Sequence, residues 1–300
     1  MRLLVTGANG QVGWELTRSL AAIGDVLAMD RKACDLSRPR DLPSIIREAN
    51  PDVIVNAAAY TAVDRAEDEE GLATLVNSTA VGVMAEEARR LGALLIHYST
   101  DYVFDGGKDS PYTEDDRPNP VNAYGRSKLG GEHAISQSAR DYLILRTSWV
   151  YAARGHNFLR TMLRLAQQRN ELSIVADQFG APTWARDIAN ATALIIERAC
   201  SQRGQADFTS GILNLTAGGS TSWCGFAETI LDEVTGRPEV SWKKPKVTPI
   251  ASSEFPQAAV RPKNSRLASE RLRGRFGITL AEWKEALALC LQDETLTKAT

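Results

Sequence analysis

A glycine-rich turn close to the N-terminus constrains the fold of this chain more than any other feature. Gly7, Gly10 and Gly13 follow the short apolar run at 3–5, and a helical pattern of apolar residues continues over 16–23. Such a turn between a buried strand and a helix lets the backbone approach a pyrophosphate, and the helix N-terminus supplies amide donors. The pattern predicts a dinucleotide-binding site, with a tight turn that binds no ligand as the alternative.

Strand and helix patterns alternate along most of the chain, which is typical of a parallel α/β sheet. We expect a Rossmann-type doubly wound parallel sheet at 1–150 that binds NAD(P), followed by a smaller C-terminal α/β substrate domain at 151–300, with one strand near 211–217 returning to the first sheet. The predicted strands are 3–5, 26–29, 53–55, 93–98, 142–145, 172–175 and 212–215. The predicted helices are 42–48, 75–91, 124–138, 158–168, 187–200, 226–234 and 280–291.

Charge and composition exclude several classes of function. The net charge of −2 creates no field that would attract nucleic acid or an anionic membrane. The glycine turn begins too early for a signal peptide, and no apolar run approaches the roughly 18 residues that span a bilayer. We therefore expect a cytoplasmic protein.

Cysteine and histidine spacing gives no sign of a metal site. The four cysteines (Cys34, Cys200, Cys224 and Cys290) are far apart, which favours reduced thiols over disulfides or a zinc site. The histidines (His97, His133 and His156) show no ligand spacing, and we interpret His97 as a core residue or one that supports the site from behind.

The end of the second predicted strand carries conflicting signals about the cofactor. Asp30, about 20 residues past the glycine turn, is placed to hold the adenosine ribose hydroxyls. Arg31 and Lys32 follow it at once and would favour a 2′-phosphate, while a merely polar turn is a third interpretation. Residues 35–36 begin the next loop and are expected to flank the adenine.

Small and polar residues follow the next two predicted strands. Small side chains at 56–61 would allow a cofactor to approach the backbone, and the acid-rich stretch at 64–70 is interpreted as a solvated helix start. Ser99, Thr100 and Asp101 end the strand at 93–98, where open α/β sheets bind their ligands.

Tyr124 and Lys128 are four residues apart and therefore lie on one face of the predicted helix. A cation beside a phenol favours the phenolate and lowers its pKa, so Tyr124 would exchange a proton with a substrate oxygen. By itself the pair is also compatible with an ordinary surface helix. The polar, proline-containing segment at 108–122 leads into Tyr124, and we interpret it as an active-site flap.

These features together resemble an extended short-chain dehydrogenase/reductase. Five segments narrow the resemblance to the dTDP-4-dehydrorhamnose reductase family: NAAAYTAVD (56–64), YSTDYVFDG (98–106), RTSWVY (146–151), QFGAPT (178–183) and RPKNSRL (261–267). The likeness implies NAD(P)H-dependent reduction of the C4 ketone of dTDP-4-dehydro-L-rhamnose to dTDP-L-rhamnose, the activated sugar of bacterial cell-surface polysaccharides. NADPH is the implied cofactor, with NADH also accepted.

The resemblance also implies roles for individual residues. The implied catalytic set is Thr100, Tyr124 and Lys128. The implied cofactor-binding residues are Gly7, Gly10, Gln11, Val12 and Gly13 at the pyrophosphate, Asp30, Arg31, Asp35 and Leu36 at the adenosine end, and Ala58, Ala59, Tyr60, Thr61, Tyr124 and Lys128 along the nicotinamide side. The implied substrate-binding residues are Thr100, Asp101, Tyr102, Phe104 and Trp149, to which we add Arg261 and Asn264 from the basic stretch at 243–266. For Trp149 the alternative is a core indole.

A homodimer and a magnesium ion at its interface are further implied features. Glu15 would suit such an ion, but Arg186 stands where a second acid would be wanted, so we expect no metal.

The basic stretch at 243–266 is a candidate for holding the substrate diphosphate. Its prolines predict an irregular loop over the cleft between domains, and arginine suits phosphate because its fork bonds two oxygens. We expect Arg261 or Arg266, with Asn264, to hold the diphosphate or the thymidine end. A solvated basic loop is the alternative.

Two other functions stay open at this point. The chain could be an epimerase or a reductase of another nucleotide deoxysugar, or a non-catalytic regulatory subunit of the kind that accompanies methionine adenosyltransferase. The intact set of Thr100, Tyr124 and Lys128 argues against the regulatory subunit, which has no need of a proton donor.

Overall fold

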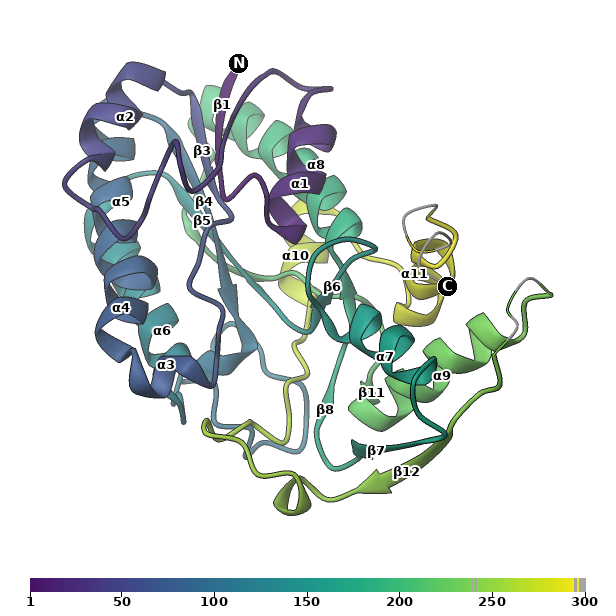
Figure 1. Cartoon of the computed structure of the whole chain (residues 1–300). Helices are drawn as coiled ribbons and strands as arrows, with labels where there is room; N and C mark the ends of the chain where they lie inside the picture. Colours follow the sequence, from purple (N-terminus) through teal and green to yellow (C-terminus); the bar gives the residue numbers. More distant parts are fainter. Residues whose placement is uncertain (239, 241, 294–295, 297–300) are drawn as a thin grey trace.

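A six-stranded parallel sheet forms the centre of the computed structural model, which describes residues 1–238, 240, 242–293 and 296 (Figure 1). Its strands run in the order β10-β5-β4-β3-β1-β2, and every neighbouring pair is parallel. The strands are β1 (Arg2–Thr6), β2 (Asp25–Met29), β3 (Val53–Asn56), β4 (Leu94–Thr100), β5 (Tyr142–Thr147) and β10 (Gly211–Asn214). The order reverses at β1, so the fold is the predicted doubly wound α/β sheet, and ligands bind such sheets at this point.

Helices cover both faces of the sheet, which is why the strands at its centre are buried. All residues of β3 and β4 are buried. One face packs against α1 (Gln11–Leu20), α8 (Ala185–Gly204) and α10 (Glu270–Phe276), and the other against α2 (Leu42–Ala49), α5 (Ala80–Leu91) and α6 (Ala123–Ser138). The strand ends between these layers place the candidate site residues.

A second apolar core lies beside the sheet in the C-terminal half (Figure 1). It is built around α7 (Phe158–Ala166), α9 (Trp223–Thr235) and α11 (Trp283–Cys290). Three two-stranded sheets flank it: β7 (Glu171–Val175) with β12 (Lys246–Ile250), β8 (Phe179–Gly180) with β11 (Thr221–Ser222), and β6 (Val150–Tyr151) with β9 (Thr183–Trp184). We propose that the chain divides near residue 150 into a cofactor-binding and a substrate-binding part, with α8 and β10 returning to the first.

Three segments differ from the sequence-based expectation. The basic stretch begins with β12, which pairs with β7 although it contains Pro249, because an edge strand tolerates a missing donor. The helix expected at 75–91 starts with a π turn, η1 (Leu75–Thr79), and is preceded by α3 (Arg65–Asp68) and α4 (Glu70–Thr74) in the acid-rich stretch. Helix α10 was not expected, because its charged residues hide a short apolar stripe.

Within the described residues, no helix combines the length and the apolar character needed to cross a membrane. All four cysteines are free thiols, three of them buried.

Candidate active site

In the glycine turn that joins β1 to α1, Gly7 and Gly13 leave no room for a Cβ. Gly7 has a φ of +70°, and a Cβ there would lie 2.7 Å from the Ala58 nitrogen. A Cβ on Gly13 would lie 2.1 Å from the Gly7 oxygen, so the helix packs directly on the turn. Gly10 precedes α1, and no side chain caps this helix among the described residues. Its first amides are therefore available for a pyrophosphate, which fits a dinucleotide at this site.

At the end of β2, the Asp30 carboxylate organises the following turn. It accepts hydrogen bonds from the Lys32 and Ala33 amides at 2.9 Å and 3.1 Å and from the Asn9 side chain at 3.1 Å. The hydrogen bond from the Ala33 amide is the main cause that holds the Asp30 pKa below its usual value. The exposed Arg31 forms an ion pair with Asp35 at 3.5 Å.

Three other pyrophosphate and adenosine candidates have contacts within the protein. Leu36 is buried in the core that covers α2 and α5. The Gln11 side-chain oxygen accepts a hydrogen bond from Asn157 at 2.8 Å. Val12 is partly buried against the sheet.

Asn77, in the π turn η1, holds the segment expected along the nicotinamide. Its amide accepts from the Tyr60 nitrogen at 2.8 Å and donates to the Tyr60 oxygen at 3.0 Å and to Ser127 at 2.9 Å. Single π turns occur frequently at functional sites, and this one places Asn77 between the Ala59–Thr61 segment and α6. Sequence reasoning missed Asn77, because a π turn has no distinct local pattern.

The structure brings Thr100, Tyr124 and Lys128 together at the carboxyl end of β4. Asn122 caps α6 by accepting a hydrogen bond from the Gly125 amide at 2.8 Å, and this cap starts the helix one residue before Tyr124. Tyr124 and Lys128 are then one turn apart, with Lys128 only 2% exposed.

The Tyr124 pKa differs from the sequence-based expectation. Burial raises this pKa, the Asp101 carboxylate raises it further, and a hydrogen bond with Thr100 acts in the opposite direction. The expected lowering by Lys128 is wrong for this structure, because the Lys128 amine bonds elsewhere. Its Nζ donates to the Tyr98 oxygen at 2.6 Å and lies 3.1 Å from His97 Nε2.

Burial also shifts the other ionisable groups of this cluster. It lowers the pKa of Lys128 to about 8, against the opposing influence of Glu132. It raises the pKa of Asp101 to about 6, although hydrogen bonds with Ser265 and Thr100 act against the shift. Perturbed groups gathered at a strand end are typical of active sites. The Asp101 contact with Ser265 was not anticipated from the sequence, although Ser265 lies within the RPKNSRL segment.

The aromatic candidates take up three different positions. Tyr102 meets Tyr124 edge to face, with ring centroids 5.7 Å apart. Trp149 stacks on Trp223 at 3.5 Å and has an unusual φ of +46°, and it is only half-buried, so it is not a core indole. Backbone strain of this kind is often kept at ligand sites.

Phe104 is 1% exposed and stacks on Tyr112 at 4.2 Å. Phe104 thus has a packing role in this structure, and its contact with substrate stays a prediction.

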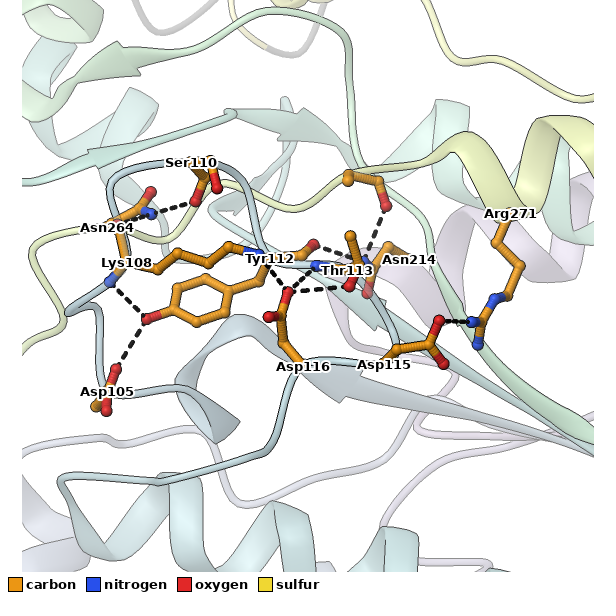
Figure 2. A network of polar contacts seen from close by, with 11 residues as sticks. Asp105, Lys108, Ser110, Tyr112, Thr113, Asp115, Asp116, Asn214, Asn264 and Arg271 are labelled. Atoms are coloured by element: carbon orange, nitrogen blue, oxygen red, sulfur yellow. Dashed lines mark hydrogen bonds and ion pairs between the residues drawn. The ribbon is translucent and has the colours of Figure 1, made fainter.

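The segment expected to form a flap is held in place by a polar network (Figure 2). The Asn264 amide donates to the backbone oxygens of Lys108 and Ser110 at 2.6 Å and 2.9 Å. The Asn214 amide donates to the Tyr112 oxygen at 3.0 Å, and Arg271 bonds Asp115. Figure 2 shows Asn264 turned toward this loop, where its amide nitrogen donates to two backbone oxygens.

The two arginine candidates for the diphosphate differ in their partners. Arg261 pairs with Asp64 at 2.7 Å, and its side chain is 13% exposed. The Asn122 amide donates to the Val260 oxygen at 2.8 Å. This hydrogen bond holds the segment at 260–261, the strap, against the start of α6. Arg266 instead bonds the Asn264 oxygen at 2.8 Å.

Comparison with known proteins assigns the chain to a family. The family model described as the RmlD substrate binding domain matches residues 1–296. A dTDP-4-dehydrorhamnose reductase of Burkholderia thailandensis is 54% identical over 98% of this chain and 99% of that protein. The chain belongs to the dTDP-4-dehydrorhamnose reductase family. A Salmonella typhimurium member of this reductase family is 44% identical over 95% of both chains.

Solved structures agree with the assignment to the reductase family. A dTDP-4-dehydrorhamnose reductase from Bacillus anthracis, in complex with NADP, superposes with a TM-score of 0.87 at 35% identity and covers 97% of this chain and 98% of its own. A Thermus thermophilus UDP-glucose 4-epimerase with NAD shares the fold at 20% identity, with a TM-score of 0.79 and coverage of 100% of both chains.

The magnesium ion implied by the likeness to this reductase family does not fit the residues present. The Arg186 guanidinium bonds Glu15 at 3.1 Å and Asp293 at 2.9 Å, so a fixed positive charge already lies between these carboxylates. Among the described residues, no group of three or more His, Cys, Asp or Glu side chains is arranged to hold a metal ion.

Proposed function

We propose that this chain is a dTDP-4-dehydrorhamnose reductase that reduces the C4 ketone of dTDP-4-dehydro-L-rhamnose to dTDP-L-rhamnose with NADPH, and also with NADH. The observation that carries the proposal is that Thr100, Tyr124 and Lys128 gather at the carboxyl end of β4. The glycine turn, which leads into the uncapped helix α1, follows β1 of the same sheet. In the same proposal, the enzyme works in the cytoplasm and its product serves cell-surface polysaccharide synthesis.

The proposed mechanism assigns one task to each member of this set. Bound NADPH supplies the hydride for C4. Tyr124 donates its phenolic proton to the ketone oxygen, and its raised pKa keeps that proton in place until the substrate is bound. Thr100 hydrogen-bonds the carbonyl and fixes its orientation, while Lys128 stabilises the phenolate and holds the nicotinamide ribose.

The direct test is the consumption of NADPH with dTDP-4-dehydro-L-rhamnose, with the product identified by mass and by NMR. Stoichiometric oxidation with formation of dTDP-L-rhamnose supports the proposal. Turnover without net redox change would instead identify an epimerase. A chain that oxidises no NADPH and co-purifies with a synthetase would be a regulatory subunit.

Cofactor preference is expected to depend on the turn after β2. The Asp30 charge disfavours a 2′-phosphate, whereas Arg31 and Lys32 attract one. We expect use of both cofactors with a modest preference for NADPH, and a shift toward NADH in the double variant Arg31→Ala/Lys32→Ala. The ratio of kcat/KM for the two cofactors measures this, and an unchanged ratio would contradict the assignment. Arg18→Ala, on the preceding helix α1, serves as a control that removes a cation elsewhere.

Arg261 is expected to hold the substrate diphosphate. Arg261→Ala should raise KM for the dTDP-sugar about tenfold or more, the effect of losing a charged hydrogen bond of roughly 1.5–3 kcal/mol. KM for NADPH should stay nearly constant, because the glycine turn holds that pyrophosphate. Lys263→Ala is the matched control, since this neighbouring side chain is 72% exposed.

Two outcomes would contradict the role of Arg261. One is that Arg261→Ala and Arg266→Ala each raise KM for the dTDP-sugar and KM for NADPH equally, or that each raises neither. The other comes from its ion-pair partner: Asp64→Asn removes a competing carboxylate and should not raise KM for the sugar nucleotide. A rise as large as that of Arg261→Ala would show that the pair only holds the strap.

A further inference from the structure

A chain of four buried polar side chains lies behind the candidate active site and ends at Lys128. Thr6, Asn56 and His97 come from the neighbouring strands β1, β3 and β4, and Lys128 comes from α6. Successive members are 2.7 Å, 3.0 Å and 3.1 Å apart, and none is more than 2% exposed. The mechanism above uses only the last of them.

The orientation of the Asn56 amide follows from a backbone donor. The Ala58 N–H can only donate, and it lies 3.2 Å from Asn56 Oδ1, so this atom is the carbonyl oxygen. Thr6 also donates to that oxygen. The Asn56 Nδ2 amide group therefore faces His97 Nδ1.

This orientation determines the tautomer of His97. An amide nitrogen has only hydrogens to offer, so His97 Nδ1 must accept, and the ring proton is on Nε2. The doubly protonated ring is disfavoured as well, because burial, the largest cause, holds the His97 pKa well below its usual value.

The Nε2–H of this tautomer points at Lys128 Nζ. An ammonium carries donors only, so two donors would meet there, whereas a neutral amine has a lone pair that accepts the Nε2–H. The neutral amine still has hydrogens for the Tyr98 oxygen at 2.6 Å. Only the neutral form of Lys128 satisfies both contacts at once.

We propose that His97 is a positioning residue whose Nε2–H holds Lys128 and favours its neutral amine in the cofactor-free enzyme, with Asn56 setting the required tautomer. Burial alone already lowers the pKa of Lys128 to about 8, and the contact with His97 acts in the same direction.

The other charged groups near Lys128 do not supply an alternative partner. From α6 these are Glu132 and Tyr124, from β5 Arg146, and from the turn after β4 Asp101. Glu132 favours the charged amine, but both its oxygens bond Arg146, at 2.8 Å and 2.6 Å. The Tyr124 phenol stays protonated because burial raises its pKa, and the Asp101 carboxylate accepts a hydrogen bond from the Thr100 hydroxyl at 3.0 Å.

Histidine NMR tests the tautomer without any enzyme assay. The chain has only three histidines, and His133 and His156 are exposed, so removing them as His133→Gln and His156→Gln assigns the remaining ring. Long-range ¹H–¹⁵N correlations of the ¹⁵N-labelled chain should show His97 as the Nε2–H tautomer across the neutral pH range. An Nδ1–H tautomer, or a ring that becomes doubly protonated within that pH range, would overturn the proposal.

A pH profile tests the effect on Lys128, and this part rests on the proposed function. In His97→Gln the side-chain carbonyl can accept from an ammonium, so the Lys128 pKa should rise. The alkaline limb of the pH profile of kcat/KM for NADPH should then move up by about one pH unit, whereas His133→Gln leaves this limb unchanged. A lower rate with an unshifted limb would overturn the positioning role and leave His97 as packing alone. If the chain oxidises no NADPH, the proposed function fails, and the NMR result still decides the tautomer.

Discussion

Tyr124→Phe is expected to lower kcat for ketone reduction by about two to four orders of magnitude, the usual contribution of a general acid. The substitution removes only the hydroxyl that would protonate the ketone oxygen. The ring keeps its edge-to-face contact with Tyr102 and its packing against Ala66, Ala73 and Ala123. NADPH affinity should therefore change little.

Steady-state kinetics and an equilibrium titration with NADPH measure the two quantities separately. Tyr142→Phe is the control, because it removes a phenol from the half-buried start of β5. Near-normal kcat in Tyr124→Phe would show that another group supplies the proton. A loss of NADPH binding equal to the loss of rate would mean that the phenol acts in binding.

Glu132→Ala is expected to lower the free energy of unfolding by roughly 3–5 kcal/mol, the effect of removing one partner of a buried ion pair. Glu132 and Arg146 form two parallel hydrogen bonds, and their side chains are 3% and 2% exposed. Arg146 would be left as an unpaired charge between α6 and β5. Its Nη1 already has no partner among the described residues.

Urea unfolding measures this loss, and two comparisons locate its cause. Gln137→Ala, at an exposed position of the same helix, should change stability by only about 0.5 kcal/mol. Adding Arg146→Met to Glu132→Ala should recover much of the loss, because no unpaired charge remains. A double variant as unstable as the single one would show that the cause is lost packing.

The paired residues hold the helix that carries Tyr124 and Lys128 against the sheet. The spacing of Tyr124 and Lys128 on α6 is a local property, and so is the glycine turn, so both were predictable from the sequence. The meeting of Thr100 with Tyr124 followed from a general rule, that ligands bind at the carboxyl ends of parallel strands. The likeness of the five segments to one reductase family is likewise a property of the sequence, and the comparisons confirm it.

Sequence patterns do not distinguish between two possible surroundings of a side chain. Phe104 and Trp149 are both aromatic residues near strand ends, yet one is buried on Tyr112 and the other is half-buried on Trp223. Pro249 suggested a loop, but an edge strand needs no donor there. Asn264 was expected at the ligand, and the loop at 108–110 uses its amide instead.

The sequence by itself determined the doubly wound sheet, the glycine turn and the family, because these depend on periodicity, backbone freedom and residue identity along a short stretch of chain. Only the tertiary structure decided the protonation chemistry of the site. The pKa values of Tyr124, Lys128 and Asp101 depend on burial and on partners from other strands. The tautomer of His97 depends on an amide that the neighbouring strand β3 supplies. Dielectric surroundings and donor–acceptor pairing exist only once distant segments have come together, so no local pattern encodes them.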